Sequence, residues 1–401
     1  MAVIIVFVIY VQLMLPATES VFWICFFIII YTYAGYPLLL QVIVLIKNII
    51  SPSQIYNNIY VPVTLIVAAY NEEDIIEAKI RNCKQLDYPA DLIKFIFVTD
   101  GSIDDTASIV KKYPEIIHLH EAERRGKLAA MNRAMLFVQT DIVIFTDANT
   151  MLNSESITKL VAHYSDGNVG AVSGEKRIMA ETGDAITQGE GLYWKYESWI
   201  KQLDSRLYTV VGAAGELFSL RTKLYTTLPG NIIIEDFVQS LLICTKGFVV
   251  RYEPGAYALE KASVSYKDEK ERKTRIAAGG FQAMVFLKKL LNIFRYPVLS
   301  FQYISHRVFR WTLAPVALIV MFVASIILAA AGSTIFSYLT FGQLVFYTAA
   351  ATGWLMARKN RDPGVFFLPF YFVFMNLCVF TGLARYLRRG QAALWKKAAR
   401  I

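Results

Sequence analysis

The sequence has few of the residues that build metal centres and disulfide frameworks. Its 401 residues include four histidines and four cysteines, the latter at positions 25, 83, 244 and 378. The cysteines form no Cys-x-x-Cys pair, so neither a zinc ribbon nor a disulfide-stapled fold is expected, and their spacing fits a reducing compartment. His118 and His120 share one face of an expected strand, where solvated or core histidines explain them better than a zinc site.

Further absences narrow the class of protein. No Gly-x-Gly-x-x-Gly follows the first expected strand, which disfavours a dinucleotide-binding oxidoreductase. Apolar residues are concentrated toward the two ends of the chain and charges in its middle, and the mean hydropathy of +0.41 is too high for an ordinary soluble protein. The formal net charge is +9. Because the basic residues crowd beside apolar segments, they favour an anionic membrane surface as partner and argue against nucleic acid.

The first 47 residues are predicted to be transmembrane. Val21–Ile46 carries no charged residue and is long enough to cross a bilayer, and Lys47 ends it. Residues 1–15 form a shorter apolar run that lacks the basic start of a signal peptide. We therefore expect a helical hairpin over 1–47, followed by a polar linker over 48–60.

A second apolar region predicts transmembrane helices over 311–384. Three segments are long enough to span: Trp311–Ala331, Thr334–Met356 and Val365–Leu383. The basic loop at 358–361 is expected on the cytoplasmic side, which places the middle of the chain there as well. The basic tail, 385–401, conflicts with this topology if all three segments span. Either one segment is re-entrant or interfacial, or the positive-inside rule fails here.

Between the apolar ends, residues 61–290 read as an α/β domain. Expected strands are Val63–Ala69, Lys94–Thr99, Glu115–His120 and Asp141–Thr146. Expected helices between them are Asp74–Gln85, Asp105–Tyr113 and Lys127–Val138. Strict alternation with short connections predicts a parallel sheet with right-handed crossovers.

After Asn149 the alternation loosens. We expect an edge-type strand at Gly170–Arg177, an amphipathic helix at Thr187–Leu203 and a strand at Phe248–Tyr252. Lys267–Leu290 begins with dense charge and ends apolar, which suits a helix along the membrane surface. Residues 291–310 are expected to be interfacial, with His306, Arg310 and Trp311 as anchors. Trp194 and Trp199 are expected to pack or to lie at the interface.

The fourth expected strand ends in Asp147 and Asn149. Ligands of open α/β sheets bind outside the carboxyl ends of the strands. If the chain stays extended, both side chains project to the same side, where two oxygens suit a hard divalent cation that holds a diphosphate. The alternative is a strand-end turn in which both side chains satisfy the backbone.

Three other strand or helix ends carry polar residues. They are Tyr70-Asn71-Glu72 after the first strand, Thr99-Asp100-Gly101 after the second, and Arg124-Arg125-Gly126-Lys127 before the third helix. A nucleotide needs acceptors for its base and ribose and cations for its diphosphate. Four such ends in order along one alternating fold fit a nucleotide site.

These ends contain the motifs AYNEE, TDGSIDDT, RRGKLAAMN and FTDANT. Their order resembles the inverting family 2 glycosyltransferases, most closely the membrane-embedded ones related to cellulose, hyaluronan and poly-N-acetylglucosamine synthases. The likeness covers about Val61 to Ala278. It implies a GT-A-type, Rossmann-like mixed-sheet domain flanked by transmembrane helices in the plasma (inner) membrane, with the catalytic domain cytoplasmic. It also implies a UDP-sugar donor, a Mg or Mn ion, and a lipid-linked or glycan acceptor.

The resemblance assigns roles at the donor site position by position. Glu72 and Asp100 match the residues that hold the uracil and ribose, and Tyr70 belongs to the same nucleotide site. Lys127 matches a lysine near the nucleotide. The metal-binding Asp-x-Asp corresponds to Asp147 and Asn149.

The resemblance also implies the catalytic group. Asp236 matches the general base of an acidic pair whose other member is Glu235. Inverting transfer is a single displacement, so a carboxylate must take the proton from the attacking hydroxyl. Without the resemblance, the pair is better explained as a helix start favoured by acids, which are common there.

Two departures from the family pattern affect the function. An amide at Asn149 is a weaker cation ligand than a carboxylate. The polymer synthases carry Gln-x-x-Arg-Trp, whereas this chain has Arg272-Lys273-Thr274-Arg275-Ile276, which keeps Arg275 as a diphosphate contact and loses the tryptophan. That loss argues against a long processive polymer. The alternatives are a processive synthase that extrudes its polymer and a non-catalytic membrane assembly subunit.

Overall fold

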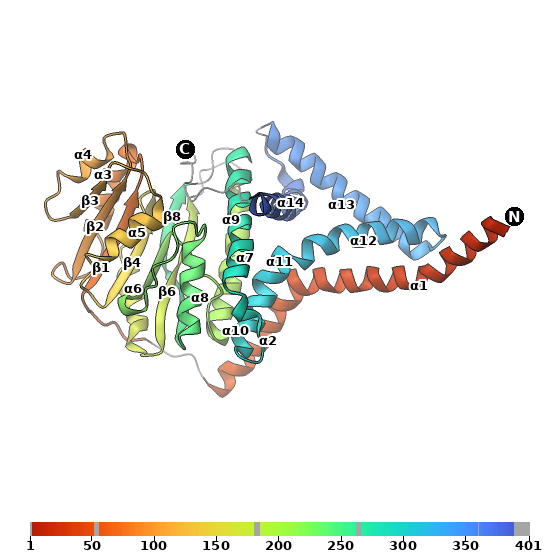
Figure 1. Ribbon diagram of the computed structural model, residues 1–401, viewed down its shortest axis with the longest axis horizontal. Coiled ribbons are helices and arrows are strands. Elements are labelled where there is room, and N and C mark those ends of the chain that lie inside the picture. The colour runs from red at the N-terminus through yellow and green to blue at the C-terminus, as the bar shows by residue number, and fades with distance from the viewer. Residues whose placement is uncertain (1, 52–55, 180–184, 262–265, 360, 389–401) are drawn as a thin grey trace.

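The computed structural model describes residues 2–51, 56–179, 185–261, 266–359 and 361–388. Figure 1 shows a domain built on a sheet, from which long helices project to one side. The predicted basic tail beyond Arg388 lies outside the described residues, as does Asn360 in the basic loop.

The described residues form an eight-stranded mixed sheet in the order β3-β2-β1-β4-β7-β6-β8-β5. The strands are β1 Val63–Ala69, β2 Ile93–Asp100, β3 Ile117–Glu121, β4 Ile142–Asp147, β5 Thr150–Leu152, β6 Val169–Met179, β7 Leu217–Arg221 and β8 Val249–Lys261. Strands β1 to β4 pair in parallel with one another, as predicted. Strand β7 pairs antiparallel with both β4 and β6, which makes the sheet mixed.

The prediction of an edge strand at Gly170–Arg177 is wrong. This segment belongs to β6, which lies between β7 and β8. The cause is the length of β8, since its pairing with β6 continues from Val249 to Lys261 across an irregularity after Glu253. The strand was expected to end at Tyr252 because Pro254 and Gly255 are unfavourable inside a strand.

Helices cover both faces of the sheet. Those of the domain are α3 Glu73–Lys84, α4 Thr106–Val110, α5 Lys127–Met135, α6 Ser156–Ala162, α7 Ala185–Leu207, α8 Glu235–Thr245 and α9 Tyr266–Phe286. Alternate residues of one strand point to opposite faces. Ile66 of β1 therefore lies in one core with α5 and α8, whereas Leu65 lies in the other with α3 and α6.

The predicted N-terminal hairpin is wrong. Helix α1, Ala2–Ile30, continues through a π-helical turn at Tyr31–Gly35 into α2, Tyr36–Ile50, without reversing direction. Pro16 lies inside α1. A proline removes one backbone hydrogen bond and bends an apolar helix, but it does not by itself turn the chain back.

Three helices of the described chain are long and apolar enough to cross a membrane: Met14–Ile50, Leu313–Ala330 and Gly364–Leu387. The C-terminal helices are α12 Leu313–Ala330, α13 Thr334–Arg358 and α14 Phe367–Leu387. Helix α13, expected to span, is long enough at 25 residues but is not among these candidates. Phe22 of α1 packs in one apolar cluster with Leu328 of α12 and Phe336 of α13, and Figure 1 shows α1 and α12 side by side.

The segment Lys267–Leu290, expected as a helix, forms most of α9. One side of α9 packs against α14, whereas Val285 and Phe286 near its end are exposed. A Cβ at Gly382 of α14 would lie 2.5 Å from the Cβ of Ala277. The hydroxyls of Thr274 and Thr381 are 3.0 Å apart. Small residues on both helices allow this close packing.

His306 and Arg310 are not the interfacial anchors that the sequence predicted. Helix α10, Pro297–Tyr303, leads into a π-helical turn at Ile304–Val308 and the short helix α11, Phe309–Trp311. His306 is fully buried, with its Nδ1 atom 2.6 Å from the carboxylate of Asp204. Arg310 forms an ion pair with Glu197. Helix α7 supplies both acids, so these charges are satisfied inside the protein.

Candidate active site

The ends of β1 and β2 are tied together by side chains of the motifs that follow them. Asn71 has a φ of 53°, a conformation that asparagine tolerates better than most residues. Its Oδ1 atom accepts the N–H of Ile103 at 2.9 Å, and its own N–H donates to Ser102 at 3.1 Å. Glu72 is buried, and its N–H donates to Thr106 Oγ1 at 2.7 Å.

Asp100 organises the loop that begins α5. Its Oδ2 atom accepts the backbone N–H groups of Arg125, at 3.0 Å, and Gly126, at 2.6 Å. The guanidinium of Arg124 lies 3.6 Å from the centre of the Tyr70 ring. Asp100 therefore holds the basic loop against the strand ends, and its contact with a ribose stays a prediction.

Gly101 has to be a glycine. Its φ is +69°, and a Cβ there would lie 2.6 Å from the Cβ of Arg124. Both the backbone conformation and the lack of space exclude a larger residue.

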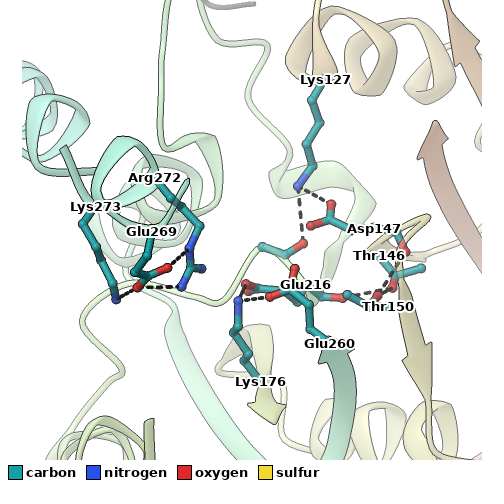
Figure 2. A network of polar contacts seen from close by, with 11 residues as sticks. Lys127, Thr146, Asp147, Thr150, Lys176, Glu216, Glu260, Glu269, Arg272 and Lys273 are labelled. Atoms are coloured by element: carbon teal, nitrogen blue, oxygen red, sulfur yellow. Dashed lines mark hydrogen bonds and ion pairs between the residues drawn. The ribbon is translucent and has the colours of Figure 1, made fainter. Parts of the chain in front are cut away.

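Lys127, at the start of α5, contacts two other elements of the site, and Figure 2 shows its contact with Asp147. Its Nζ atom lies 2.7 Å from Asp147 Oδ1 at the end of β4 and 3.2 Å from Glu235 Oε1 at the start of α8. Burial disfavours the charged ammonium, but Asp147 and Glu235 outweigh it and raise the pKa of Lys127 above its usual value. The lysine is thus a fixed positive charge among carboxylates.

Asp236 lies beside this lysine. A Cβ at Gly215 would lie 3.0 Å from Asp236 Oδ2 and 3.4 Å from Lys127 Nζ, so the glycine leaves room for both groups. Burial, and then the negative charge of Glu235, raises the pKa of Asp236 to about 7, although Lys127 opposes the shift. A carboxyl with a pKa in this range can take up a proton near neutral pH.

The turn after β4 differs from the extended chain that the sequence argument assumed. The strand ends at Asp147, and β5 begins at Thr150 after a turn at residues 148 and 149. Thr150 Oγ1 donates to the carbonyl of Asp147 at 3.0 Å. The expectation that both side chains project from an extended strand is therefore wrong, although the two residues remain neighbours.

The turn carries two side chains with oxygen atoms of the kind that a divalent cation binds, Asp147 and Asn149. The described residues contain no group of three or more His, Cys, Asp or Glu that could hold a metal ion. Asp147 is partly exposed, with only its Oδ1 atom paired to Lys127. Its other oxygen and the amide oxygen of Asn149 are the hard donors that Mg or Mn prefers, and a diphosphate would have to complete the shell.

The sequence analysis missed a buried ion network next to these groups. Lys176 of β6 lies 2.7 Å from Glu216 Oε1 and also pairs with Glu260 of β8 (Figure 2). Burial alone would raise the pKa of Glu216, but Lys176 holds it below its usual range. In the sequence these residues are isolated charges, Lys176 within β6 and Glu260 within β8. Only the pairing of the two strands brings the charges together.

Helix α9 positions the loop that leads into Glu235 and Asp236. Arg275 donates to the carbonyl of Ile233 at 3.4 Å, and Gln282 accepts the N–H of Ile233 at 3.0 Å. A Cβ at Gly279 would lie 3.0 Å from the side chain of Ile234. Burial lowers the pKa of Arg275 from its usual value, although the negative charges of Glu235 and Asp236 oppose the shift.

Comparison with known proteins agrees with this geometry. Residues 64–228 match the family model described as Glycosyl transferase family 2. The chain contains a family 2 glycosyltransferase domain. The mixed sheet and the helices on its two faces form the GT-A-type fold that the resemblance implied. That prediction is confirmed.

Two curated relatives share part of the chain. The poly-beta-1,6-N-acetyl-D-glucosamine synthase of Staphylococcus aureus strain MSSA476 is 28% identical over 234 residues, which are 56% of this chain and 55% of that protein. The probable glycosyltransferase YdaM of Bacillus subtilis strain 168 is 24% identical over 245 residues, 58% of each chain. The match to this glycosyltransferase domain thus spans little more than half the length of these relatives.

A solved structure extends the likeness beyond the domain. The mannosyltransferase PcManGT from Pyrobaculum calidifontis, determined with GDP-Man and Mn2+, superposes with a TM-score of 0.68 at 22% identity. The superposition covers 93% of this chain and all of that one. At this identity the likeness shows a shared fold that includes the flanking helices.

Proposed function

We propose that this protein is a membrane-embedded inverting glycosyltransferase that moves a sugar from a UDP-sugar to a lipid-linked or glycan acceptor. The catalytic domain, about residues 61–290, would face the cytoplasm from the plasma (inner) membrane. The observation that carries the proposal is the meeting of Lys127 with Asp147 and Glu235 beside Asp236. These residues lie on three separate elements, and the family resemblance assigns them to one reaction centre.

Each group would have one role in the displacement. Asp236 would accept the proton of the acceptor hydroxyl. At the same time the oxygen of that hydroxyl would bond to the anomeric carbon, and the bond from this carbon to the diphosphate would break. Lys127 and Arg275 would offset the negative charge on the departing diphosphate. A divalent cation held by Asp147 and Asn149 would stabilise the same charge. Tyr70, Glu72 and Asp100 would hold the nucleoside.

A processive polysaccharide synthase is a second candidate. It is favoured by the matched relatives named poly-beta-1,6-N-acetyl-D-glucosamine synthase. The lost tryptophan after Arg275 favours transfer of single sugars. The length of the product decides between the two.

The test is release of the nucleoside diphosphate, UDP or GDP according to the donor, by the purified full-length protein in lipid. The donors are UDP-glucose, UDP-N-acetylglucosamine and UDP-galactose, with GDP-mannose added because PcManGT was solved with GDP-Man. Release from one donor with Mg or Mn, and none with chelator, is the expected result. No release from any donor after addition of acceptor lipids, despite tight UDP binding, would favour the non-catalytic subunit.

Replacing Asp147 by alanine should weaken UDP binding in a metal-dependent way. Loss of the carboxylate removes a cation ligand, so we expect affinity in Mn to fall at least about tenfold. Calorimetric titration with UDP, in Mn and in chelator, measures the effect. Asp141→Ala, at the exposed opposite end of β4, is the matched control and should leave both affinities unchanged. Equal, metal-independent binding by Asp147→Ala and the unmutated protein would contradict the assignment.

The transfer rate should depend on the ionisation of Asp236. Its pKa is raised to about 7. Because the base acts as a carboxylate, kcat/KM should rise as the pH increases through this value and fall below it. Initial rates between about pH 5 and 9 measure the profile. The control is Glu253→Gln, which removes a carboxylate of β8 that pairs with His163. This change should leave the fall of kcat/KM at low pH where it is in the unmutated protein. A flat profile would contradict the assignment.

A further inference from the structure

A fully buried lysine contacts both ends of the turn that carries Asp147 and Asn149. Lys79 belongs to α3, and none of its surface is exposed. Its Nζ atom donates to Thr146 Oγ1 at 3.1 Å and to the carbonyl of Thr150 at 2.7 Å. The first of these residues precedes the turn and the second follows it. The ammonium group therefore joins the two ends of the turn.

The burial of this lysine is costly. An ammonium group loses its hydration on burial, and buried charges in proteins are normally paired with an opposite charge. Within the described part of the chain, no carboxylate forms an ion pair with Lys79, and both of its hydrogen-bond acceptors are uncharged. Burial lowers the pKa of Lys79 from its usual value, although Cys83 and Asp147 oppose the shift. A methionine would fill similar space without this cost, so packing of the core does not explain the lysine.

The two threonines extend the contacts of Lys79 to the neighbouring parts of the site. Their hydroxyl oxygens lie 3.2 Å apart (Figure 2). Thr150 Oγ1 donates to the carbonyl of Asp147 at 3.0 Å. Thr146 Oγ1 donates to the carbonyl of Glu216 at 2.9 Å. The lysine is thus connected to the backbone of the proposed metal ligand and to the segment that adjoins the proposed base.

Helix α3 also holds the strand that follows the turn. Asn82 comes three residues after Lys79, which places both side chains on one face of the helix. It donates to the carbonyl of Leu152 at 2.8 Å and accepts the N–H of the same residue at 2.9 Å. One face of α3 therefore binds β5 at its first residue and at its last residue.

We propose that Lys79 is a positioning residue for the ligands of the divalent cation. By joining the two ends of the turn, it fixes the conformation in which Asp147 and Asn149 would bind the cation that accompanies the donor. The inference rests on the proposed function and adds a residue that lies outside the four motifs. One carboxylate and one amide are few ligands for such a cation, so their orientation matters the more. Replacing a residue that orients metal ligands usually lowers metal affinity by about 10–100-fold.

Lys79→Met tests the inference, because methionine has a similar shape but no hydrogen-bond donor. Binding of UDP by the purified full-length protein is titrated calorimetrically in Mn and in chelator. We expect the affinity in Mn to fall at least about tenfold. The affinity in chelator should stay the same, since the nucleoside is assigned to the ends of other strands. The unfolding temperature should change little, because loss of the buried charge offsets the lost hydrogen bonds.

The same substitution in the Asp147→Ala protein shows whether Lys79 acts through the turn. There it should weaken binding in Mn by less than about twofold, because a ligand that it positions is already lost. The matched control is Lys84→Met, the same substitution at an exposed residue of α3 whose Nζ atom lies 2.6 Å from Glu115. It should leave both affinities unchanged.

Three results would overturn the inference. They are an unchanged affinity of Lys79→Met in Mn, an equal loss in Mn and in chelator accompanied by a lower unfolding temperature, and an undiminished loss in the Asp147→Ala protein. The second of these would assign the lysine to stability alone. Nucleoside diphosphate release by the unmutated protein tests the proposed function separately. Release that requires Mn, together with unchanged UDP binding by Lys79→Met, would overturn the inference and leave the proposed function intact.

Discussion

Replacing Asp236 by asparagine is expected to reduce sugar transfer by about 10²–10⁴-fold, the usual contribution of a general base. The amide keeps the size of the side chain but cannot accept the proton of the acceptor hydroxyl. The Asp236 carboxylate lies next to Lys127, in space that is available because residue 215 is a glycine. An isosteric change should therefore not disturb its surroundings. Initial rates of transfer from the active UDP-sugar measure the loss.

Binding of UDP separates loss of the base from loss of the donor site. Asp236→Asn should bind UDP with nearly the affinity of the unmutated protein, because the nucleotide is assigned to the ends of β1, β2 and β4. Glu253→Gln serves again as the control and should retain its transfer rate. Turnover by Asp236→Asn within a few-fold of the unmutated rate would exclude Asp236 as the base.

Replacing Asp204 by alanine is expected to lower the free energy of unfolding by at least about 3 kcal/mol, because three buried side chains lose an acceptor at about 1–3 kcal/mol each. Its carboxylate accepts the hydroxyl of Tyr36 at 2.5 Å and lies 2.6 Å from Nδ1 of His306. Gln302 donates to both its side chain and its carbonyl. Asp204 therefore links α2, α7 and α10, and its loss leaves fully buried polar groups without a partner.

Thermal unfolding of the purified protein in detergent, followed by circular dichroism, measures this effect. Tyr36→Phe removes a single hydrogen bond to the charged group and should cost about 1.5–3 kcal/mol. Asp141→Ala removes an exposed carboxylate and should change the unfolding temperature little. If Asp204→Ala unfolds at the same temperature as Asp141→Ala, the buried cluster does not hold the helices to the domain.

Part of this architecture was predictable because it depends on local patterns. Apolar runs with β-branched residues predicted β1 to β4, and the structure confirms them as neighbouring parallel strands. Apolar length predicted the helices that flank the domain. The hairpin at the N-terminus was wrong because Pro16 and the polar residues after it can be accommodated inside one helix, and a sequence pattern does not distinguish a bend from a reversal.

The candidate site was predictable only where it follows strand ends. Parallel strands place their carboxyl ends at one edge, so Glu72, Asp100 and Asp147 were expected together. The contact of Lys127 with Glu235 joins residues more than a hundred positions apart, and the family resemblance pointed to both residues without showing that they pair. The network of Lys176, Glu216 and Glu260 gave no motif at all, because it exists only after β6 and β8 pair.

The sequence by itself determined the alternating domain, its family 2 motifs and the apolar helices on either side, because each is encoded by residue types at short spacing. Only the tertiary structure decided which charges meet. A buried polar contact depends on the packing of elements distant in the chain, as for Asp204 and His306 or Lys127 and Glu235.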